Sequence, residues 1–277
     1  MVQSLTADFK HGSEFGVAPP KSGQVLKTDQ RNRRHCSTTF TATHVASGGV
    51  VGTGSALGNV VLVHGAFVDG STWRAVYDIL AQDGYHVAVV QNPTLSLQGD
   101  AALTRLVVDA QDGPVVLVGH SYGGAVITEA GNHPKVTTLV YIAAFVPDKG
   151  ESVRTLNGDP NAPGSPLVSA PGGYLFQDRS GFHNSFGADL PAADAAFLAD
   201  AQVPFAEEAM GQPVSDPAWR SKPSSFLIAT EDQMIAPSAQ RAMAQRAGAT
   251  TTEVAASHAV YMSQPAQTAA VIRQAYI

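Results

Sequence analysis

The sequence predicts an α/β fold in which a mainly parallel, doubly wound sheet is covered by helices on both faces. Three observations predict it. Short apolar runs alternate with amphipathic segments, and one of these runs is followed by a Gly-x-Ser-x-Gly motif. A long segment rich in proline and glycine interrupts the alternation. The chain has 277 residues, of which 44% are hydrophobic, so it can form one catalytic domain with an insertion.

The serine lies in the stretch Gly119-His120-Ser121-Tyr122-Gly123, which follows the aliphatic run from Val115 to Val118. The residues after it can form a helix. A strand, a sharp turn and a helix with Gly-x-Ser-x-Gly at the corner are typical of a nucleophile elbow, where only very small residues fit two positions before and after the serine. We therefore predict that Ser121 is a nucleophile.

The apolar runs predict parallel strands joined by right-handed crossovers. These strands are expected at residues 59–63, 86–90, 115–118, 136–144, 225–229 and 251–255. Helices are expected between and after them. We place these helices from Ser71, as the cap residue, to Leu80, at 100–111, from the elbow to about Asn132, at 237–247 and at 260–276.

About 75 residues separate Pro147 from Pro223, which is far more than a simple connection needs. We predict that this insertion, 147–223, folds as a helical cap over the active site, after the strand that ends near Ala144. Its helices are expected at 192–201 and 205–211. Most phenylalanines of the insertion are expected to hold the cap together, and one or two to line a pocket.

The first 57 residues are polar and interrupted by glycine and proline, which predicts a weakly ordered N-terminal extension. The run Gly12-Ser13-Glu14-Phe15 looks like translated cloning sites, so the extension is interpreted as vector-derived; the alternative is a native extension with an edge strand at 38–43. The catalytic domain is then 58–277. No signal peptide is recognised, and the apolar run from Leu139 to Val146 is too short to span a membrane, which predicts a cytoplasmic protein.

The composition limits the kinds of ligand and partner that the protein is expected to bind. The net charge is −6 and no long basic block is present, which argues against a nucleic-acid partner. The single cysteine, Cys36, has no second thiol, and no cluster of histidine and cysteine has ligand spacing, so we expect no metal and no cofactor. The expected partner is a small-molecule substrate. The oligomeric state is left open.

A serine nucleophile needs a histidine base that a carboxylate orients. His258 follows the last predicted strand, at the sheet edge where functional groups collect. Asp232 follows the preceding strand and is the predicted carboxylate, with Glu231 as its solvated neighbour. His120 is expected to brace the elbow, and His64 to support the loop after the first strand.

That loop, His64-Gly65-Ala66-Phe67, is expected to supply one backbone donor of an oxyanion hole, from Ala66. The second donor is the backbone N–H of Tyr122, directly after the nucleophile. For the substrate pocket, the sequence indicates three phenylalanines: Phe67, Phe145 and Phe182.

From Asn59 to the C-terminus, the chain resembles the α/β-hydrolase superfamily, and most closely the small capped carboxylesterases related to plant methylesterases and hydroxynitrile lyases. Four motifs carry the resemblance, in the order nucleophile, acid, base that the superfamily uses. They are Val61-Leu62-Val63-His64-Gly65-Ala66, Gly119-His120-Ser121-Tyr122-Gly123-Gly124, Ala229-Thr230-Glu231-Asp232 with Pro237, and Ser257-His258 with Ser263-Gln264-Pro265. The resemblance implies the α/β-hydrolase fold.

The same resemblance separates two chemistries. The lyase branch has a threonine after the oxyanion-loop histidine and a lysine after the catalytic histidine, where this chain has Gly65 and Ala259. The resemblance therefore implies a serine carboxylesterase that hydrolyses small to medium esters through an acyl-enzyme. Two alternatives stay open: a related serine hydrolase or lyase acting on lactones, amides or C–C bonds, and a receptor that retains the triad but only binds its ligand.

Overall fold

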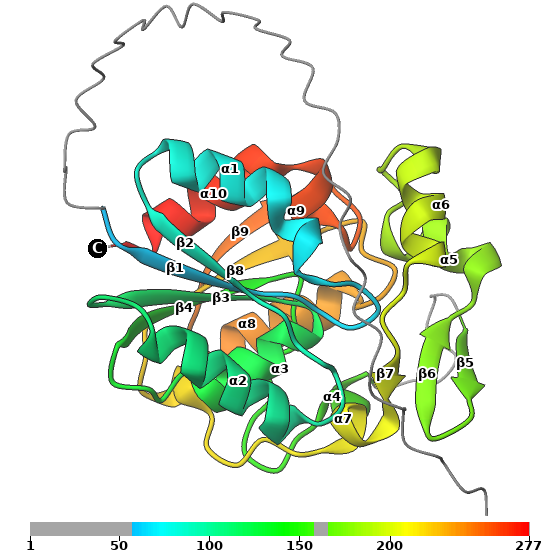
Figure 1. The fold of residues 1–277 in the computed structure, drawn as a ribbon, viewed down its shortest axis with the longest axis horizontal. Coiled ribbons are helices and arrows are strands. Elements are labelled where there is room, and N and C mark those ends of the chain that lie inside the picture. Colours follow the sequence, from blue (N-terminus) through cyan, green and yellow to red (C-terminus); the bar gives the residue numbers. More distant parts are fainter. Residues whose placement is uncertain (1–56, 158–165, 277) are drawn as a thin grey trace, which may run out of the picture. The chain divides into compact units, whose positions relative to one another are not determined.

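The computed structural model describes residues 57–157 and 166–276 (Figure 1). The extension predicted at 1–57 lies outside the described residues except for Leu57, so its proposed order and origin stay predictions. In the described ranges, the main sheet has six strands in the order β2-β1-β3-β4-β8-β9, all parallel. The strands are β1 (Asn59–Val63), β2 (His86–Val90), β3 (Val115–His120), β4 (Val136–Ile142), β8 (Ser224–Ala229) and β9 (Thr250–Val254).

The apolar runs form strands because the sheet is buried on both faces. Successive side chains of a strand point to opposite faces, and β1 illustrates the result. Val61 and Val63 belong to the core on one face, whereas Val60 and Leu62 belong to the core on the other. The α/β class and the parallel sheet predicted from the sequence are confirmed.

Three helices cover each face of the sheet (Figure 1). On one face are α1 (Arg74–Gln82), α9 (Val260–Ser263) and α10 (Pro265–Gln274). On the other are α2 (Leu97–Asp109), α3 (Tyr122–Ala130) and α8 (Pro237–Arg246). A short 3₁₀ helix, Gly70–Trp73, precedes α1, and a second, Ala218–Arg220, precedes β8.

Two predicted helix starts are wrong. Ser71 is not the cap of the first helix, because the Asp69 side chain accepts the Ser71 N–H at 2.7 Å and caps the 3₁₀ turn instead. The second helix starts at Leu97 rather than residue 100, because the Ser96 hydroxyl accepts the Gly99 N–H and caps it.

Two other boundaries also differ from the prediction. The final helix is interrupted at Gln264, because Pro265 has no N–H to continue the first segment and instead begins α10. The fourth strand ends at Ile142 rather than residue 144, since Ala143 has a φ of 43°, which no strand contains.

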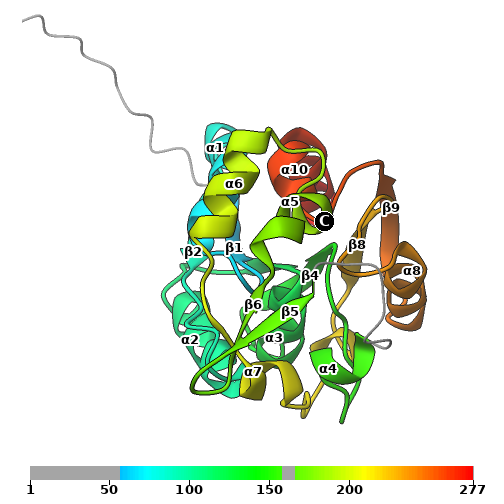
Figure 2. The ribbon, with the colours of Figure 1, turned by 90° about the vertical axis from the view of Figure 1, so that its right-hand side faces the viewer.

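The insertion carries structure of its own, as predicted from its length (Figure 2). The helix expected at 192–201 is present as α6, but the one expected at 205–211 starts with a two-residue strand. The antiparallel sheet β5-β6-β7 and the helix α5 were not predicted. The elements are α4 (Val153–Leu156), β5 (Leu167–Ala170), β6 (Tyr174–Gln177), α5 (Arg179–Phe186), α6 (Ala192–Asp200), β7 (Phe205–Ala206) and α7 (Glu207–Gly211).

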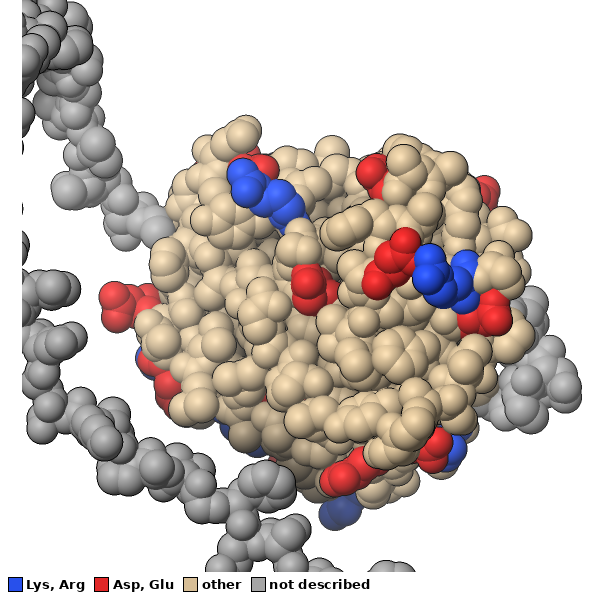
Figure 3. Space-filling model, turned by 45° about the vertical axis from the view of Figure 1, so that its right-hand side comes forward, with Lys and Arg blue, Asp and Glu red and all other residues tan. Residues whose placement is uncertain are grey.

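Among the helices of the described ranges, none has the length and apolar character needed to cross a membrane. On the side of the molecule that carries the cap, acidic and basic side chains are scattered among wide uncharged areas (Figure 3).

Candidate active site

Ser121 lies at the corner between β3 and α3, with φ 54° and ψ −122°. A positive φ is strained for a residue with a side chain and holds the serine in a tight turn. The neighbouring glycines are required by space: a Cβ at Gly119 would lie 2.4 Å from the Gly123 carbonyl oxygen, and one at Gly123 would lie 2.6 Å from the Val63 carbonyl oxygen. The local geometry therefore has the strand, turn and helix of a nucleophile elbow.

The structure brings His258 and Asp232 together. The His258 Nδ1–H donates to Asp232 Oδ2 at 2.8 Å, and both side chains are buried. The other oxygen of Asp232 accepts the backbone N–H groups of Met234 at 2.7 Å and Ile235 at 3.0 Å. Glu231 is exposed to solvent. The carboxylate that orients the histidine is thus itself fixed by backbone donors.

The other ring nitrogen of His258, Nε2, is buried and has no hydrogen-bond partner among the described residues. Nδ1 carries the proton of the hydrogen bond to Asp232. Nε2 of the neutral ring therefore has a lone pair and can accept a proton. Ser121, 8% exposed, is also buried. The arrangement can therefore act as a base in a place largely closed to water.

His120 connects the elbow to the loop that carries His258. Its Nε2–H donates to the His258 carbonyl oxygen at 3.0 Å, and the two rings lie 4.6 Å apart. Burial and the neighbouring His258 lower the pKa of His120 well below its usual value, so the ring is neutral at pH 7. His120 thus braces the base loop as well as the elbow.

The loop after β1 is fixed by His64. Its Nδ1–H donates to the Gly65 carbonyl oxygen at 2.8 Å, and its Nε2 accepts the Asn92 N–H at 2.8 Å. Burial lowers the pKa of His64, which favours this neutral form. The next residues are Ala66, buried, and Phe67, which has a φ of 68° and accepts the N–H of Val203 from the cap. The backbone around Ala66 is therefore held at both ends.

The three predicted pocket residues are all buried, but they lie at different distances from Ser121 and His258. Phe145 donates its N–H to the Ser121 carbonyl oxygen at 3.1 Å, so it adjoins the elbow. Phe67 lies in the loop after β1, next to Ala66. Phe182 stacks on Phe186 at 5.0 Å, and it is Phe186 that meets the His258 ring edge-on at 5.2 Å. Phe182 is thus one aromatic layer away from the histidine.

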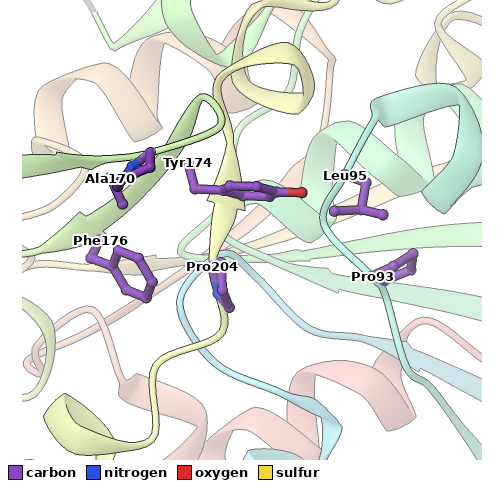
Figure 4. Close-up of a pocket in the computed structure, with 7 residues that line it drawn as sticks. Pro93, Leu95, Ala170, Tyr174, Phe176 and Pro204 are labelled. Carbon is purple, nitrogen blue, oxygen red and sulfur yellow. The ribbon is translucent and has the colours of Figure 1, made fainter. Parts of the chain in front are cut away.

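A hollow of about 390 Å³ lies elsewhere on the cap (Figure 4), and none of these phenylalanines lines it. Leu175 pairs with Phe205 across β6 and β7 and shares its buried face, where Phe205 packs on Tyr122 at 4.8 Å. Tyr174, adjacent to Leu175, points to the opposite face. The hollow therefore lies between this face of the cap sheet and the loop after β2, which contributes Pro93 and Leu95 (Figure 4). It is lined by Pro93, Leu95, Ala170, Pro171, Tyr174, Phe176 and Pro204.

Two polar residues near the site were missed in the sequence. The side-chain amide of Gln240, in α8, donates to Asp232 Oδ2 at 2.8 Å and to the Ile235 carbonyl oxygen. Asp100, in α2, accepts the Tyr122 hydroxyl at 2.6 Å, and burial raises the pKa of Asp100 to about 6. A signal existed for both, because each falls on the buried face of its helix.

In the described part of the chain, no group of three or more histidine, cysteine, aspartate or glutamate side chains is placed to hold a metal ion.

Residues 60–271 match the alpha/beta hydrolase family, and the chain belongs to that family. Its fold is also that of polyneuridine aldehyde esterase, whose crystal structure superposes with a TM-score of 0.67 at 18% identity, covering 78% of this chain and 98% of that one. The membership of the α/β-hydrolase superfamily that the four motifs predict is confirmed.

Two curated relatives are similar in sequence. A pyrethroid hydrolase of Sphingobium wenxiniae is 29% identical over 246 residues, which cover 77% of this chain and 86% of the relative. A carbendazim hydrolyzing esterase of Nocardioides sp. is 37% identical over 114 residues, 36% of this chain. That second match spans about half of the relative, 47% of its length.

Proposed function

We propose that the protein is a serine carboxylesterase that hydrolyses small to medium carboxylic esters. The observation that carries the proposal is the strained serine at the elbow, together with a buried histidine hydrogen-bonded to a buried carboxylate. Both curated relatives are named as hydrolases, one of them an esterase, which supports the reaction class.

In the proposed mechanism, Ser121 attacks the ester carbonyl while His258 Nε2 takes the hydroxyl proton. Asp232 stabilises the imidazolium that forms. His258 then protonates the leaving alcohol, and a water activated by the same nitrogen hydrolyses the acyl-enzyme. The backbone N–H groups of Ala66 and Tyr122 donate to the oxyanion, and a lost donor of this kind costs on the order of 3 kcal/mol of barrier.

Two positions favour ester hydrolysis over the lyase chemistry of related enzymes. A Cβ at Gly65 would lie 2.7 Å from Ser121 Cβ, so a larger side chain there needs the elbow to shift. Ala259 is fully buried against Phe182 and Phe186, a setting that disfavours a cation. Neither position offers the polar group that would stabilise a leaving cyanide.

The substrate pocket is proposed to include Phe67, from the loop after β1, and Phe145, which adjoins the elbow, with Phe182 on the side of His258, behind Phe186. These aromatic walls suit an uncharged substrate. The scattered charges on the cap side of the surface agree with a neutral ligand (Figure 3).

The test is hydrolysis of short p-nitrophenyl esters by the wild type and by Ser121→Ala. The variant is expected to lose at least about 10³-fold in kcat, because without the nucleophile only the oxyanion hole and binding remain. The exposed Ser71→Ala is the matched control and should keep wild-type activity. Substantial turnover by Ser121→Ala would remove Ser121 as the nucleophile, and an inactive wild type that binds esters would favour a receptor.

A further inference from the structure

The cap is hydrogen-bonded to the loop of His258 on both sides of that histidine. The backbone N–H of Ser257 donates to Asp189 Oδ2 at 3.3 Å, and the Ser257 hydroxyl donates to the other oxygen of the same carboxylate. On the other side, the Ala259 N–H donates to the Phe186 carbonyl oxygen at 2.9 Å. Phe186, the last residue of α5, and Asp189, which follows it, thus hold the two neighbours of His258.

The contact is apolar as well as polar. Phe186 meets the His258 ring edge-on, and the Ala259 side chain is fully buried in a cluster with Phe186 and Leu190. The Ser257 hydroxyl also lies 3.3 Å from the Phe186 carbonyl oxygen. A shift of the 186–190 segment therefore moves the backbone on which His258 is carried.

Asp189 is the charged member of this contact. Burial opposes its ionisation, but the hydrogen bonds that the carboxylate accepts, those from Ser257 foremost, outweigh burial and hold the pKa of Asp189 below its usual value. The carboxylate is thus ionised at neutral pH, and hydrogen bonds to an ionised acceptor are shorter and stronger than neutral ones. Ser257 is fully buried, so its hydroxyl needs a hydrogen-bond partner from the protein.

We propose that Asp189 is a positioning residue for the catalytic histidine, which it reaches through Ser257. It fixes the loop from the cap side, while Asp232 fixes the imidazole and His120 fixes the His258 carbonyl from the core side. This inference rests on the proposed function of Ser121 and His258. Misplacement of a base by about 1 Å lowers the rate by up to about a hundredfold.

The test compares Asp189→Ala and Ser257→Ala with the conservative Ser257→Thr, which keeps the hydroxyl. Asp194→Asn, an exposed carboxylate of the cap helix α6, is the matched control. Kinetics with p-nitrophenyl acetate separate kcat from KM. A second readout is the labelling rate with a fluorophosphonate, in which the Ser121 Oγ–P bond forms, the P–F bond breaks, fluoride leaves and the proton passes to His258.

We expect Asp189→Ala and Ser257→Ala to lower kcat and the labelling rate by about tenfold or more, with KM within about twofold of wild type. Ser257→Thr and Asp194→Asn should stay near wild type, and the unfolding midpoints should change little. Wild-type kcat and labelling in both alanine variants would overturn the inference, as would a rise in KM alone, which would assign the contact to substrate binding.

Failure of the proposed function would look different. The wild type itself would then neither hydrolyse the ester nor be labelled at Ser121, whatever residue stands at 189. If Asp189→Ala fails to fold, Ser257→Ala decides the question, because it leaves the cap carboxylate in place and removes only the hydroxyl.

Discussion

Asp100 is an acidic side chain enclosed in the protein beside the nucleophile elbow. It accepts the Tyr122 hydroxyl through one oxygen and the Thr94 N–H through the other. Thr94 in turn donates its hydroxyl to the Pro204 carbonyl oxygen, at the cap. One buried carboxylate thus connects the residue after Ser121 to the base of the cap.

This carboxylate predicts a pH dependence of stability. The pKa of Asp100 is raised to about 6 in the folded protein, above the ordinary value of 3.8, so the folded state binds its proton more tightly than the unfolded state. Its contribution to the free energy of unfolding is therefore full below pH 4 and is lost as the pH rises to about 6. The loss is on the order of 2 kcal/mol.

In Asp100→Asn this contribution is absent. The measurement is urea unfolding of the variant and the wild type at pH 4 and pH 7. The altered hydrogen bonds lower the free energy of unfolding of the variant by a constant amount. Relative to the wild type, the free energy of unfolding of the variant should rise by about 2 kcal/mol from pH 4 to pH 7. Asp194→Asn serves as the exposed control, with no such trend. A difference that is independent of pH would show that Asp100 does not titrate in this range.

Among single residues, the sequence could identify those whose role follows from position along the chain. Ser121 stands in a motif, and Asp232 and His258 follow predicted strands. Residues that hold these three side chains in place from distant parts of the chain could not be found in this way. Asp189 contacts the loop of His258 across 68 residues of chain, and nothing local distinguishes it from other polar side chains.

At the level of elements, the elbow is a turn whose backbone atoms leave no room for a side chain at its glycines. A Cβ at Gly119 would lie 2.4 Å from the carbonyl oxygen and 2.7 Å from the carbonyl carbon of Gly123, both backbone atoms that cannot rotate away. We expect Gly119→Ala to lower the free energy of unfolding by about 3 kcal/mol or more, since the turn must open to accept the methyl group.

Urea or thermal unfolding measures this effect. Gly211→Ala is the matched control, because a Cβ there would meet only the tip of the Arg154 side chain, at 3.3 Å. It should change the stability by less than about 0.5 kcal/mol. A Gly119→Ala variant as stable as the control would mean that the elbow can relax and that its glycines are not needed for space.

Elements of the main sheet could be predicted because their apolar pattern follows from burial on both faces. The cap elements could not. The face of β6 that carries Tyr174 and Phe176 is partly exposed, and β7 has two residues, so neither strand gives a clear alternating signal. Helix starts were misplaced for another reason, since Asp69 and Ser96 cap them through side-chain contacts that neighbouring polar residues could also make.

At the scale of the whole molecule, the sheet separates two apolar cores, and the site lies where the cap meets the carboxyl ends of the strands. The elbow helix packs in one core, whereas Ala256, two residues before His258, packs in the other. The proposed site therefore depends on both cores at once. The ring of His120, at the end of β3, packs on Trp73 and Tyr261 of the second core, and its hydrogen bond to the His258 carbonyl oxygen joins the elbow to the loop of His258.

All of these parts lie within residues 57–276, and the contacts of the chain divide it into residues 1–52 and 53–277. We therefore predict that a chain starting at Thr53 keeps the activity and stability of the full chain. Its kcat/KM on p-nitrophenyl acetate should agree within about twofold and its unfolding midpoint within about 2 °C.

A chain starting at His64 is the matched control. It lacks β1, which pairs with both β2 and β3, and should therefore not fold, because loss of a central strand leaves two sheet edges and both cores open. If the chain from Thr53 instead lost most of its activity, while the full chain hydrolysed the ester, the N-terminal residues would have to contribute to the catalytic domain. The boundary predicted near residue 58 would then be wrong, and the domain would begin earlier in the sequence.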